Sequence, residues 1–235
     1  MNILLEAFQQ AFDLVVKLDA DLLEILLLSM KVSFISLFLS CLIGLPLGTF
    51  LAIKNFVFRD SLLIIFNTMM GLPPVVVGLI VYIAISRSGP FGWLGILYTP
   101  TAMIIAQMIL IIPIIVSLSA QIIEDIHLEY KNIFMSLVVP ADKAVKAYLF
   151  DARYSIFTVL LAGFGRAISE VGAVIIVGGN IDHLTRVMTT SIALETSKGN
   201  LSLALALGII LLLIALTVNF LLIHLKIRAK SKLYV

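Results

Sequence analysis

Five long apolar stretches, separated by shorter polar segments, dominate the pattern of the chain. They cover roughly residues 25–53, 62–85, 101–120, 156–177 and 201–225. Each stretch meets or exceeds the ~20 residues that a helix needs to cross the hydrocarbon core of a bilayer. The pattern therefore predicts an all-α protein with five transmembrane helices, in a single domain that covers residues 1–235.

The segment that precedes the first stretch, residues 1–21, is amphipathic. Leu4, Phe8, Phe12 and Val15 recur at helical spacing, and charged or amide side chains occupy positions between them. Such a helix is too polar to span a membrane. We expect it to lie in the membrane interface or to pack against a partner, as a sixth element outside the five spans.

Composition agrees with a membrane protein, and the cations predict its orientation. Hydrophobic residues make up 61% of the chain and charged residues 13%, which is more apolar surface than a soluble core of this size can bury. With the N-terminus outside and the C-terminus inside, most cations lie on the cytoplasmic side, as the positive-inside rule requires. These cations are Lys54, Arg59, Lys131, Lys143, Lys146, Arg153, Lys226, Arg228, Lys230 and Lys232. A net charge of +2 spread along the membrane gives no indication of nucleic-acid binding.

Proline and glycine interrupt two of the predicted spans. The sequence GLPLG places Pro46 in the first span, and GLPPVVVG places Pro73 and Pro74 in the second. Proline removes a backbone donor and crowds the preceding turn, so the first helix is expected to bend. In the second span one interpretation is a structural kink. The alternative is a gate, in which the freed carbonyl groups line a water-filled cavity.

Residues 121–153 form a long polar segment among otherwise short loops. Helical periodicity continues as far as Leu137, and Pro140 restarts the chain before a second helical pattern over residues 141–148. A structureless loop of this length is uncommon in a compact domain. We therefore expect a helix, a break and a short second helix that project together into the cytoplasm.

Several motifs resemble one family of membrane proteins. In order along the chain they are GLPPVVVG, SRSGPFGWLG, IIPIIV, GFGRAISEVGA and VGGNI. With them, residues 29–219 resemble the permease subunits of ATP-binding-cassette importers for molybdate and tungstate, and TRVMTTSIALETSKGNLSLALALG favours the tungstate branch. The family's cytoplasmic Glu-Ala-Ala, Gly and Leu-Pro positions hold Lys131-Asn132-Ile133, Leu137 and Leu149-Phe150 here. Only Leu149 matches that consensus.

The resemblance implies a type I importer permease in the cell membrane of a prokaryote. Two copies of the chain would form the pathway, two cytoplasmic ATPase subunits would drive it, and an extracytoplasmic binding protein would deliver the solute. The chain itself has no GxxxxGK[ST] phosphate loop. We therefore expect no catalytic site, metal or cofactor on this chain, with ATP and magnesium bound by the partner ATPase.

In such importers a cytoplasmic coupling helix contacts the ATPase. The resemblance implies that residues 121–153 form the coupling loop, with the coupling helix near residues 132–145. The residues expected to contact the ATPase are Asn132, Ile133, Ser136, Leu137, Pro140, Ala141, Asp142, Lys143 and Val145.

Polar residues in and beside the fourth span are further candidates. Arg166 and Glu170 are four apart, so they share a helix face and can form a salt bridge. A charge inside the bilayer costs about 2.5–3.5 kcal/mol on insertion scales. The alternative is that Arg166 contacts the transported anion or the second copy. Asn180 follows two glycines and is expected to end the helix in a left-handed turn, or else to contact the delivery protein.

Other functions remain open at this point. Molybdate or another small solute would use the same fold and coupling loop as tungstate. A secondary transporter would normally have more spans, an internal repeat and ion ligands near the membrane midplane, which this sequence does not display. A purely structural membrane subunit is a further alternative.

Overall fold

The computed structural model describes residues 2–17 and 19–231, and within this part every regular element is a helix. In chain order the elements are α1 (Asn2–Val16), α2 (Ala20–Ile53), α3 (Arg59–Met69), α4 (Pro74–Ile85), the 3-10 turn η1 (Gly92–Leu94), α5 (Pro100–Ser136), α6 (Ala141–Ile168), α7 (Gly172–Gly178), α8 (Met188–Ser197) and α9 (Leu201–Ser231).

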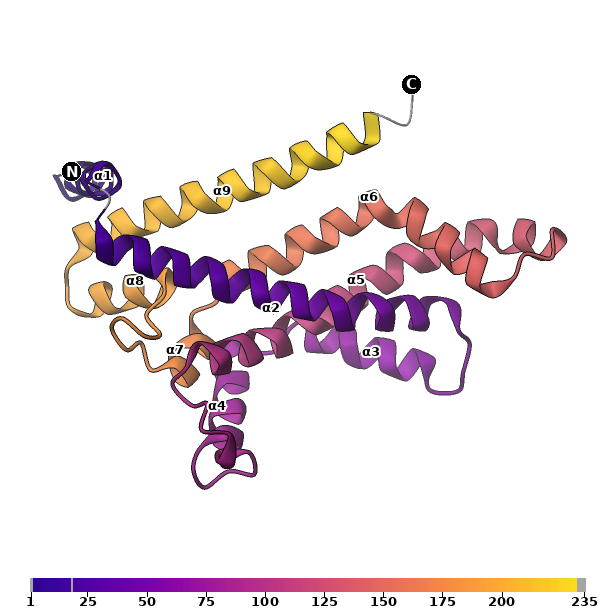
Figure 1. Cartoon of the computed structure of the whole chain (residues 1–235), viewed down its shortest axis with the longest axis horizontal. Helices are drawn as coiled ribbons and strands as arrows, with labels where there is room; N and C mark the ends of the chain where they lie inside the picture. The colour runs from indigo at the N-terminus through magenta and orange to yellow at the C-terminus, as the bar shows by residue number, and fades with distance from the viewer. Residues whose placement is uncertain (1, 18, 232–235) are drawn as a thin grey trace.

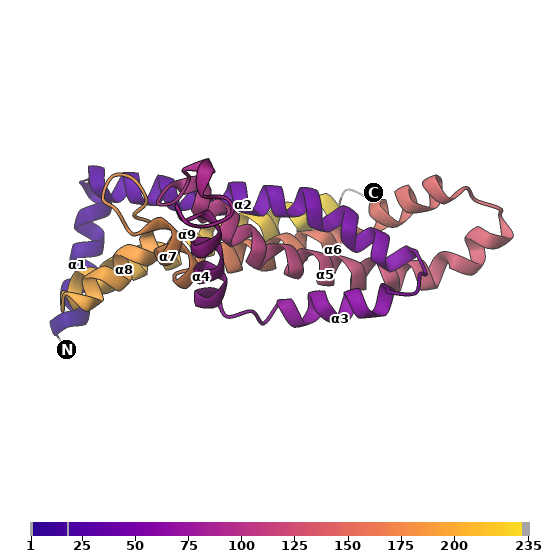
Figure 2. The ribbon, with the colours of Figure 1, turned by 90° about the horizontal axis from the view of Figure 1, so that it is seen from below.

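The long helices α2, α5, α6 and α9 run along the long axis of the molecule, and α5 packs against α2, α3, α4, α6 and α7 (Figures 1 and 2). Small residues let α2 and α5 approach closely. A Cβ atom at Gly48 would lie 2.1 Å from Ser119 Oγ and 2.7 Å from the Val116 carbonyl oxygen. The helix α2 continues through Pro46 from Ala20 to Ile53. The GLPLG segment therefore serves close helix packing within an unbroken helix.

Three of the described helices are long and apolar enough to cross a membrane alone: α2, α5 and residues 201–224 of α9. Two further spans exist only as bent pairs. The pair α3 and α4 bends by 103°, and the pair α6 and α7 bends by 54°. Counting each pair as one span gives the predicted five. The sequence indicated the break before α4, but it predicted a continuous fourth span over residues 156–177.

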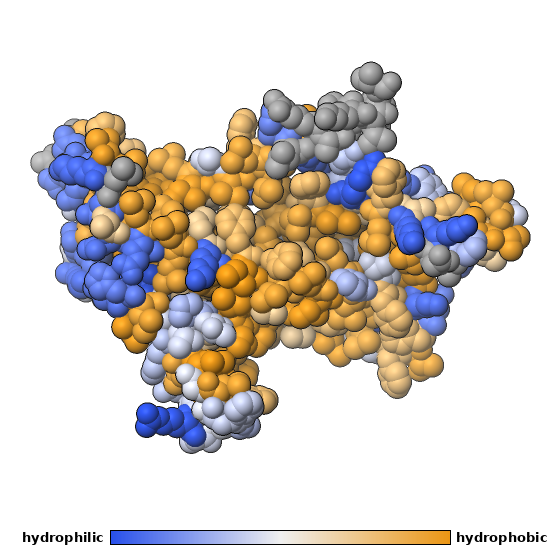
Figure 3. Space-filling model, viewed as in Figure 1, coloured by the Kyte–Doolittle hydropathy of each residue, from blue (hydrophilic) through white to orange (hydrophobic). Residues whose placement is uncertain are grey.

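The surface has the distribution expected of a protein that crosses a bilayer. Apolar side chains cover the middle of the molecule, and hydrophilic side chains gather at the end where α1 and α8 lie, in separate groups on the hairpin between α5 and α6, and at the tip of the projection that contains α4 (Figure 3). Large apolar residues such as Leu27, Phe38, Leu213 and Phe220 are more than half exposed along α2 and α9. In a soluble protein such an apolar belt would promote aggregation, whereas in a membrane lipid chains cover it.

The helix α1 crosses one end of the bundle instead of running along it (Figures 1 and 2). Its small residues Ala7 and Ala11 are buried, and Ala11 belongs to a core cluster with residues of α9. The neighbouring Phe8 and Phe12 are 61% and 69% exposed. An amphipathic helix with this placement fits an element that lies in the membrane interface.

Candidate functional site

The break in the fourth span holds Arg166 and Glu170. The helix α6 ends at Ile168, and α7 begins at Gly172. Arg166 Nη2 lies 3.3 Å from Glu170 Oε2, and the two side chains are 29% and 2% exposed. The predicted ion pair is thus confirmed, but Glu170 lies beyond the end of the helix that carries Arg166.

Glu170 also caps the next helix. Its Oε1 accepts a hydrogen bond from the backbone N–H of Ala173, at 3.0 Å, in the first turn of α7. The hydroxyl of Thr189 donates to the Glu170 carbonyl oxygen at 2.8 Å. A carboxylate is stabilised at a helix N-terminus by the helix dipole and by the free N–H groups. Glu170 therefore joins α6, α7 and α8, which is more than a mutual salt bridge with Arg166.

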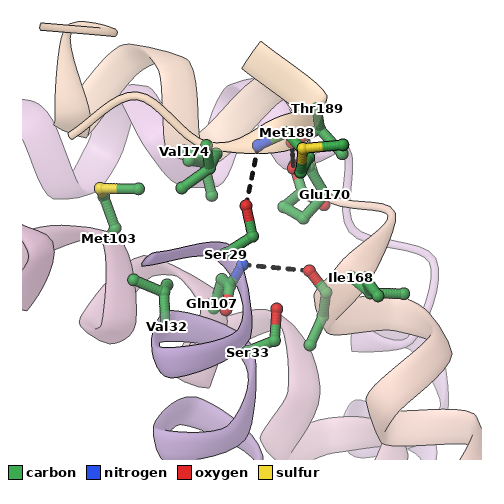
Figure 4. A pocket seen from close by; sticks show the side chains of 12 residues that line it. Ser29, Val32, Ser33, Met103, Gln107, Ile168, Glu170, Val174, Met188 and Thr189 are labelled. Atoms are coloured by element: carbon green, nitrogen blue, oxygen red, sulfur yellow. Dashed lines mark hydrogen bonds between the residues drawn. The ribbon is translucent and has the colours of Figure 1, made fainter. Parts of the chain in front are cut away.

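A small polar cavity lies beside this break (Figure 4). Its volume is about 10 Å³, which is room for about one water molecule. It lies where α2, α5, the break and the start of α8 meet. The lining residues are Ser29, Val32, Ser33, Met103, Gln107, Ala167, Ile168, Glu170, Val174, Val187, Met188 and Thr189. No polyatomic anion fits this space, so the centre of the bundle is closed in this conformation.

Hydrogen bonds around the cavity connect elements that are distant in sequence. Gln107 Nε2 donates to the Ala167 carbonyl oxygen at 3.1 Å, and the Ser36 hydroxyl donates to Gln107 Oε1 at 2.7 Å. The backbone N–H of Met188 donates to Ser29 Oγ at 2.8 Å. Figure 4 shows the contacts of Gln107 and Ser29. This buried network ties α2, α5 and α6 to the start of α8.

The sequence analysis missed Ser29, Ser36 and Gln107, although the sequence contains a signal for them. Ser29, Ser33, Ser36 and Ser40 follow one another at steps of four, three and four residues. This spacing puts them on one face of a helix. Gln107 is an amide within an apolar span, and polar residues there usually face protein or water.

The break before α4 lies next to the break before α7. Pro73 precedes α4, and Pro74 is its first residue. At the first position of a helix a backbone N–H has no partner within the helix, so proline costs no hydrogen bond there. A Cβ atom at Gly172 would lie 2.9 Å from Val75 Cγ2. The structure therefore places the break that contains Pro73 and Pro74 beside Gly172, two residues after Glu170. Whether these breaks act as a gate stays a prediction.

Asn180 lies at the opposite end of α7 from Glu170, so it is not part of this cluster. Gly179 and Asn180 have φ angles of 73° and 49°, which confirms the left-handed turn at the end of the helix. The buried Thr185 hydroxyl donates to the Gly178 carbonyl oxygen at 2.6 Å. This contact fixes the turn that follows α7.

The loop after this turn contacts the start of α2. His183 Nδ1 lies 2.8 Å from Glu24 Oε2. The hydrogen bond to Glu24, with the negative charges of Glu24 and Asp182, raises the pKa of His183 above its usual value. Within the described residues, no three His, Cys, Asp or Glu side chains are grouped so that they could hold a metal ion.

Residues 121–153 form a helical hairpin, called the hairpin below. Helix α5 extends to Ser136, a turn covers residues 137–140, and α6 begins at Ala141 and continues without interruption to Ile168 (Figure 1). The expected short separate helix over residues 141–148 is therefore wrong, since it is the first part of α6. The expected single coupling helix near residues 132–145 is instead two helix ends and a turn.

The residues predicted to contact the ATPase divide among these parts of the hairpin. Asn132, Ile133 and Ser136 end α5, Leu137 and Pro140 belong to the turn, and Ala141, Asp142, Lys143 and Val145 begin α6. The side chains of Ala141 and Asp142 lie outside the described part of the structure.

The hairpin has a packed interior and an apolar tip. Tyr148 is buried, stacks on Phe134 with ring centroids 5.5 Å apart, and its hydroxyl lies 3.0 Å from His127 Nδ1. At the tip, Leu137 and Val138 are 67% and 85% exposed. Exposed apolar residues on a well-packed projection outside the apolar belt are typical of a protein interaction site.

Comparison with known proteins also indicates a membrane permease. Residues 44–230 match a family described as the inner membrane component of binding-protein-dependent transport systems. The chain is similar to the tungstate uptake system permease protein of Peptoclostridium acidaminophilum, with 38% identity over 96% of this chain and 99% of that protein. The corresponding protein of Campylobacter jejuni is 35% identical over 96% and 95%. A probable anion ABC transporter permease protein of Haloferax volcanii is 40% identical over 85% and 88%.

Proposed function

Because this chain belongs to the family of inner membrane components of binding-protein-dependent transport systems, we propose that it forms the membrane pathway of an ATP-driven importer for tungstate. The chain is a multi-pass protein of a prokaryotic inner membrane. In the proposed complex, two copies of it associate with two cytoplasmic ATPase subunits and receive the anion from an extracytoplasmic binding protein. ATP and magnesium are bound by the ATPase subunits.

The continuity of α6 carries the mechanical part of this proposal. One helix runs from Ala141 at the hairpin to Ile168 beside the break, and Glu170 follows in that break. The helix stays uninterrupted through the bend that Figure 1 shows near its middle, so a displacement at the hairpin reaches the polar centre of the bundle along one helix. There is no flexible loop between the two sites to absorb the movement.

We infer the following coupling step. Closure of the ATPase pair shifts the hairpin, and α6 transmits the shift to the break that holds Arg166 and Glu170. The closed polar cavity beside the break then opens to one side of the membrane. Such switching between two packed arrangements is a common form of conformational change, because packed cores are bistable.

The relatives and the chemistry of the cavity support an oxyanion as the solute. Two relatives that match almost the whole chain are named as tungstate uptake permeases. The Ser33 hydroxyl and the second amide N–H of Gln107, whose first N–H bonds to Ala167, are groups that can donate hydrogen bonds to an oxyanion. Arg166 does not line the cavity, but it pairs with Glu170, which does, and its side chain is 29% exposed. Molybdate is the alternative solute, because both anions present the same tetrahedral arrangement of oxygens.

The test is ATP hydrolysis by the complex of this chain with its ATPase and binding protein, reconstituted in lipid. Tungstate, molybdate and sulfate are loaded onto the binding protein in turn, and the empty binding protein is the control. We expect tungstate to stimulate hydrolysis most. Stimulation by molybdate alone would show that the solute is molybdate, and the proposal of an ATP-driven importer would stand. If no complex with an ATPase formed, the proposed function would be wrong.

A further inference from the structure

An apolar groove lies between α1, α2 and α9. Leu14 and Val15 of α1 close one end of it, Leu22 and Leu26 of α2 form one wall, and residues 210–218 of α9 form the other. Its volume is about 350 Å³. The wall on α9 extends over eight residue steps, which is about 12 Å along the helix at 1.5 Å per residue. The groove thus runs along α9 for about two helical turns.

A polar pocket of about 350 Å³ adjoins this groove at the end of the bundle where α1 lies. Leu14 lines both cavities, and the other side chains around the pocket include Asp13, Lys17 and Asp19. Lys17 Nζ lies 3.0 Å from Asp13 Oδ2. Two carboxylates and one ammonium give the pocket an excess of one negative charge.

We propose that the groove holds an acyl chain of a phospholipid and that the polar pocket holds its amine-bearing headgroup, as in phosphatidylethanolamine. The apolar lining of the groove suits part of an acyl chain. The headgroup phosphate pairs with Lys17, and the amine pairs with a carboxylate of the pocket. A zwitterionic headgroup leaves the net charge of the pocket at one negative, whereas an anionic lipid such as phosphatidylglycerol would raise it to two.

The position of the two cavities supports a lipid over other occupants. The groove opens within the apolar belt, where Leu23 and Leu213 are 38% and 58% exposed. The polar pocket begins where that belt ends, at the amphipathic α1. An apolar slot directly below a charged pocket reproduces the division between the acyl chains and the headgroup of a phospholipid.

The first test fills the groove. The full-length chain is purified in mild detergent from membranes that contain both lipids, and the bound phospholipid is counted by native mass spectrometry. We expect the unmodified chain to retain phosphatidylethanolamine and Leu213→Trp to lose it. The matched control is Leu212→Trp, because Leu212 is 64% exposed on the same helix but does not line the groove. Equal retention by the two variants would overturn the proposal.

The second test reverses the charge of the headgroup pocket. Asp13→Lys changes the excess from one negative to one positive charge, so the retained lipid should shift from phosphatidylethanolamine to phosphatidylglycerol. Glu6→Lys makes the same change on an exposed position of α1 outside the pocket and should leave the preference unchanged. An identical preference in both variants would contradict the headgroup assignment.

A second copy of the chain is the competing occupant. If it filled the groove, Leu213→Trp would convert dimers to monomers while the unmodified dimer retained no lipid in the same mass spectrum. That result would overturn the proposal in favour of a subunit interface. Neither test measures transport, so their failure would leave the proposed tungstate import untouched.

Discussion

Glu170 is a buried carboxylate whose charge is balanced from two sides. Arg166 approaches Oε2, and the first turn of α7 donates to Oε1 through the N–H of Ala173. Removing one partner of a buried ion pair costs about 3–5 kcal/mol, because the other charge is left without compensation. Removal of the Glu170 carboxylate also removes the cap of α7. This cap lies in the break that would move in the proposed coupling step.

Replacement of Glu170 by Ala should therefore lower uptake without lowering the affinity of the permease for its delivery protein. The break would lose both its ion pair and its helix cap, while Asn180 and the loop beyond α7 would keep their contacts. Radiolabelled tungstate uptake and binding of the delivery protein are measured on the same membranes. Ser169→Ala is the control, since its exposed hydroxyl bonds only to carbonyl groups of its own helix. Unchanged uptake by Glu170→Ala would contradict the role given to the break.

The Arg166 and Glu170 pair was predictable from its spacing, but the helix end between the two residues was not. The segment GFGRAISEVGA contains no proline, and its apolar content fits a continuous span. At the break, the hydroxyl of Thr189, which is 19 residues away, donates to the Glu170 carbonyl oxygen. A contact of this kind is tertiary and leaves no trace in local hydropathy.

At the scale of elements, the hairpin differs most from expectation. Residues 149–155 are more polar than the spans around them, so the pattern suggested a loop between a short helix and the fourth span. They contain neither glycine nor proline, however, and α6 runs through them. Hydropathy distinguishes bilayer from water and does not distinguish an exposed helix from a loop. The turn at Pro140 was predicted because proline favours the first turn of a helix and ends the preceding one.

Replacement of Leu137 by Asp should weaken docking of the ATPase while the permease still folds. Leu137 is 67% exposed at the tip of the hairpin, so a charge there spoils an apolar contact surface without entering the core. The measurements are recovery of the ATPase with the purified permease and tungstate uptake, and both should fall. Leu128→Asp is the matched control, because Leu128 is 63% exposed on α5 away from the tip. An equal loss in the two variants would argue against the tip as the docking site.

At the scale of the whole molecule, the chain has more surface than a compact protein of its mass. Its accessible area is 13,445 Å², whereas a folded monomer of 25.7 kDa is expected to expose about 10,400 Å². The projecting hairpin and the transverse helices α1 and α4 account for an open shape (Figures 1 and 2). Lipid chains cover the apolar belt. Around a bent pair such as α3 and α4 the surface is uneven, and another protein surface packs against it better than lipid chains do.

This surplus predicts that the permease is a dimer even without its ATPase. An excess of about 3,000 Å² exceeds the area of roughly 1,600 Å² that a stable protein interface typically buries in total. The chain is reconstituted alone in lipid nanodiscs, and its mass is measured by mass photometry over a range of protein-to-nanodisc ratios. Two chains per disc should persist when discs are in large excess, because specific association resists dilution. Single chains under that condition, which paired only when the ATPase was added, would show that the ATPase holds the two copies together.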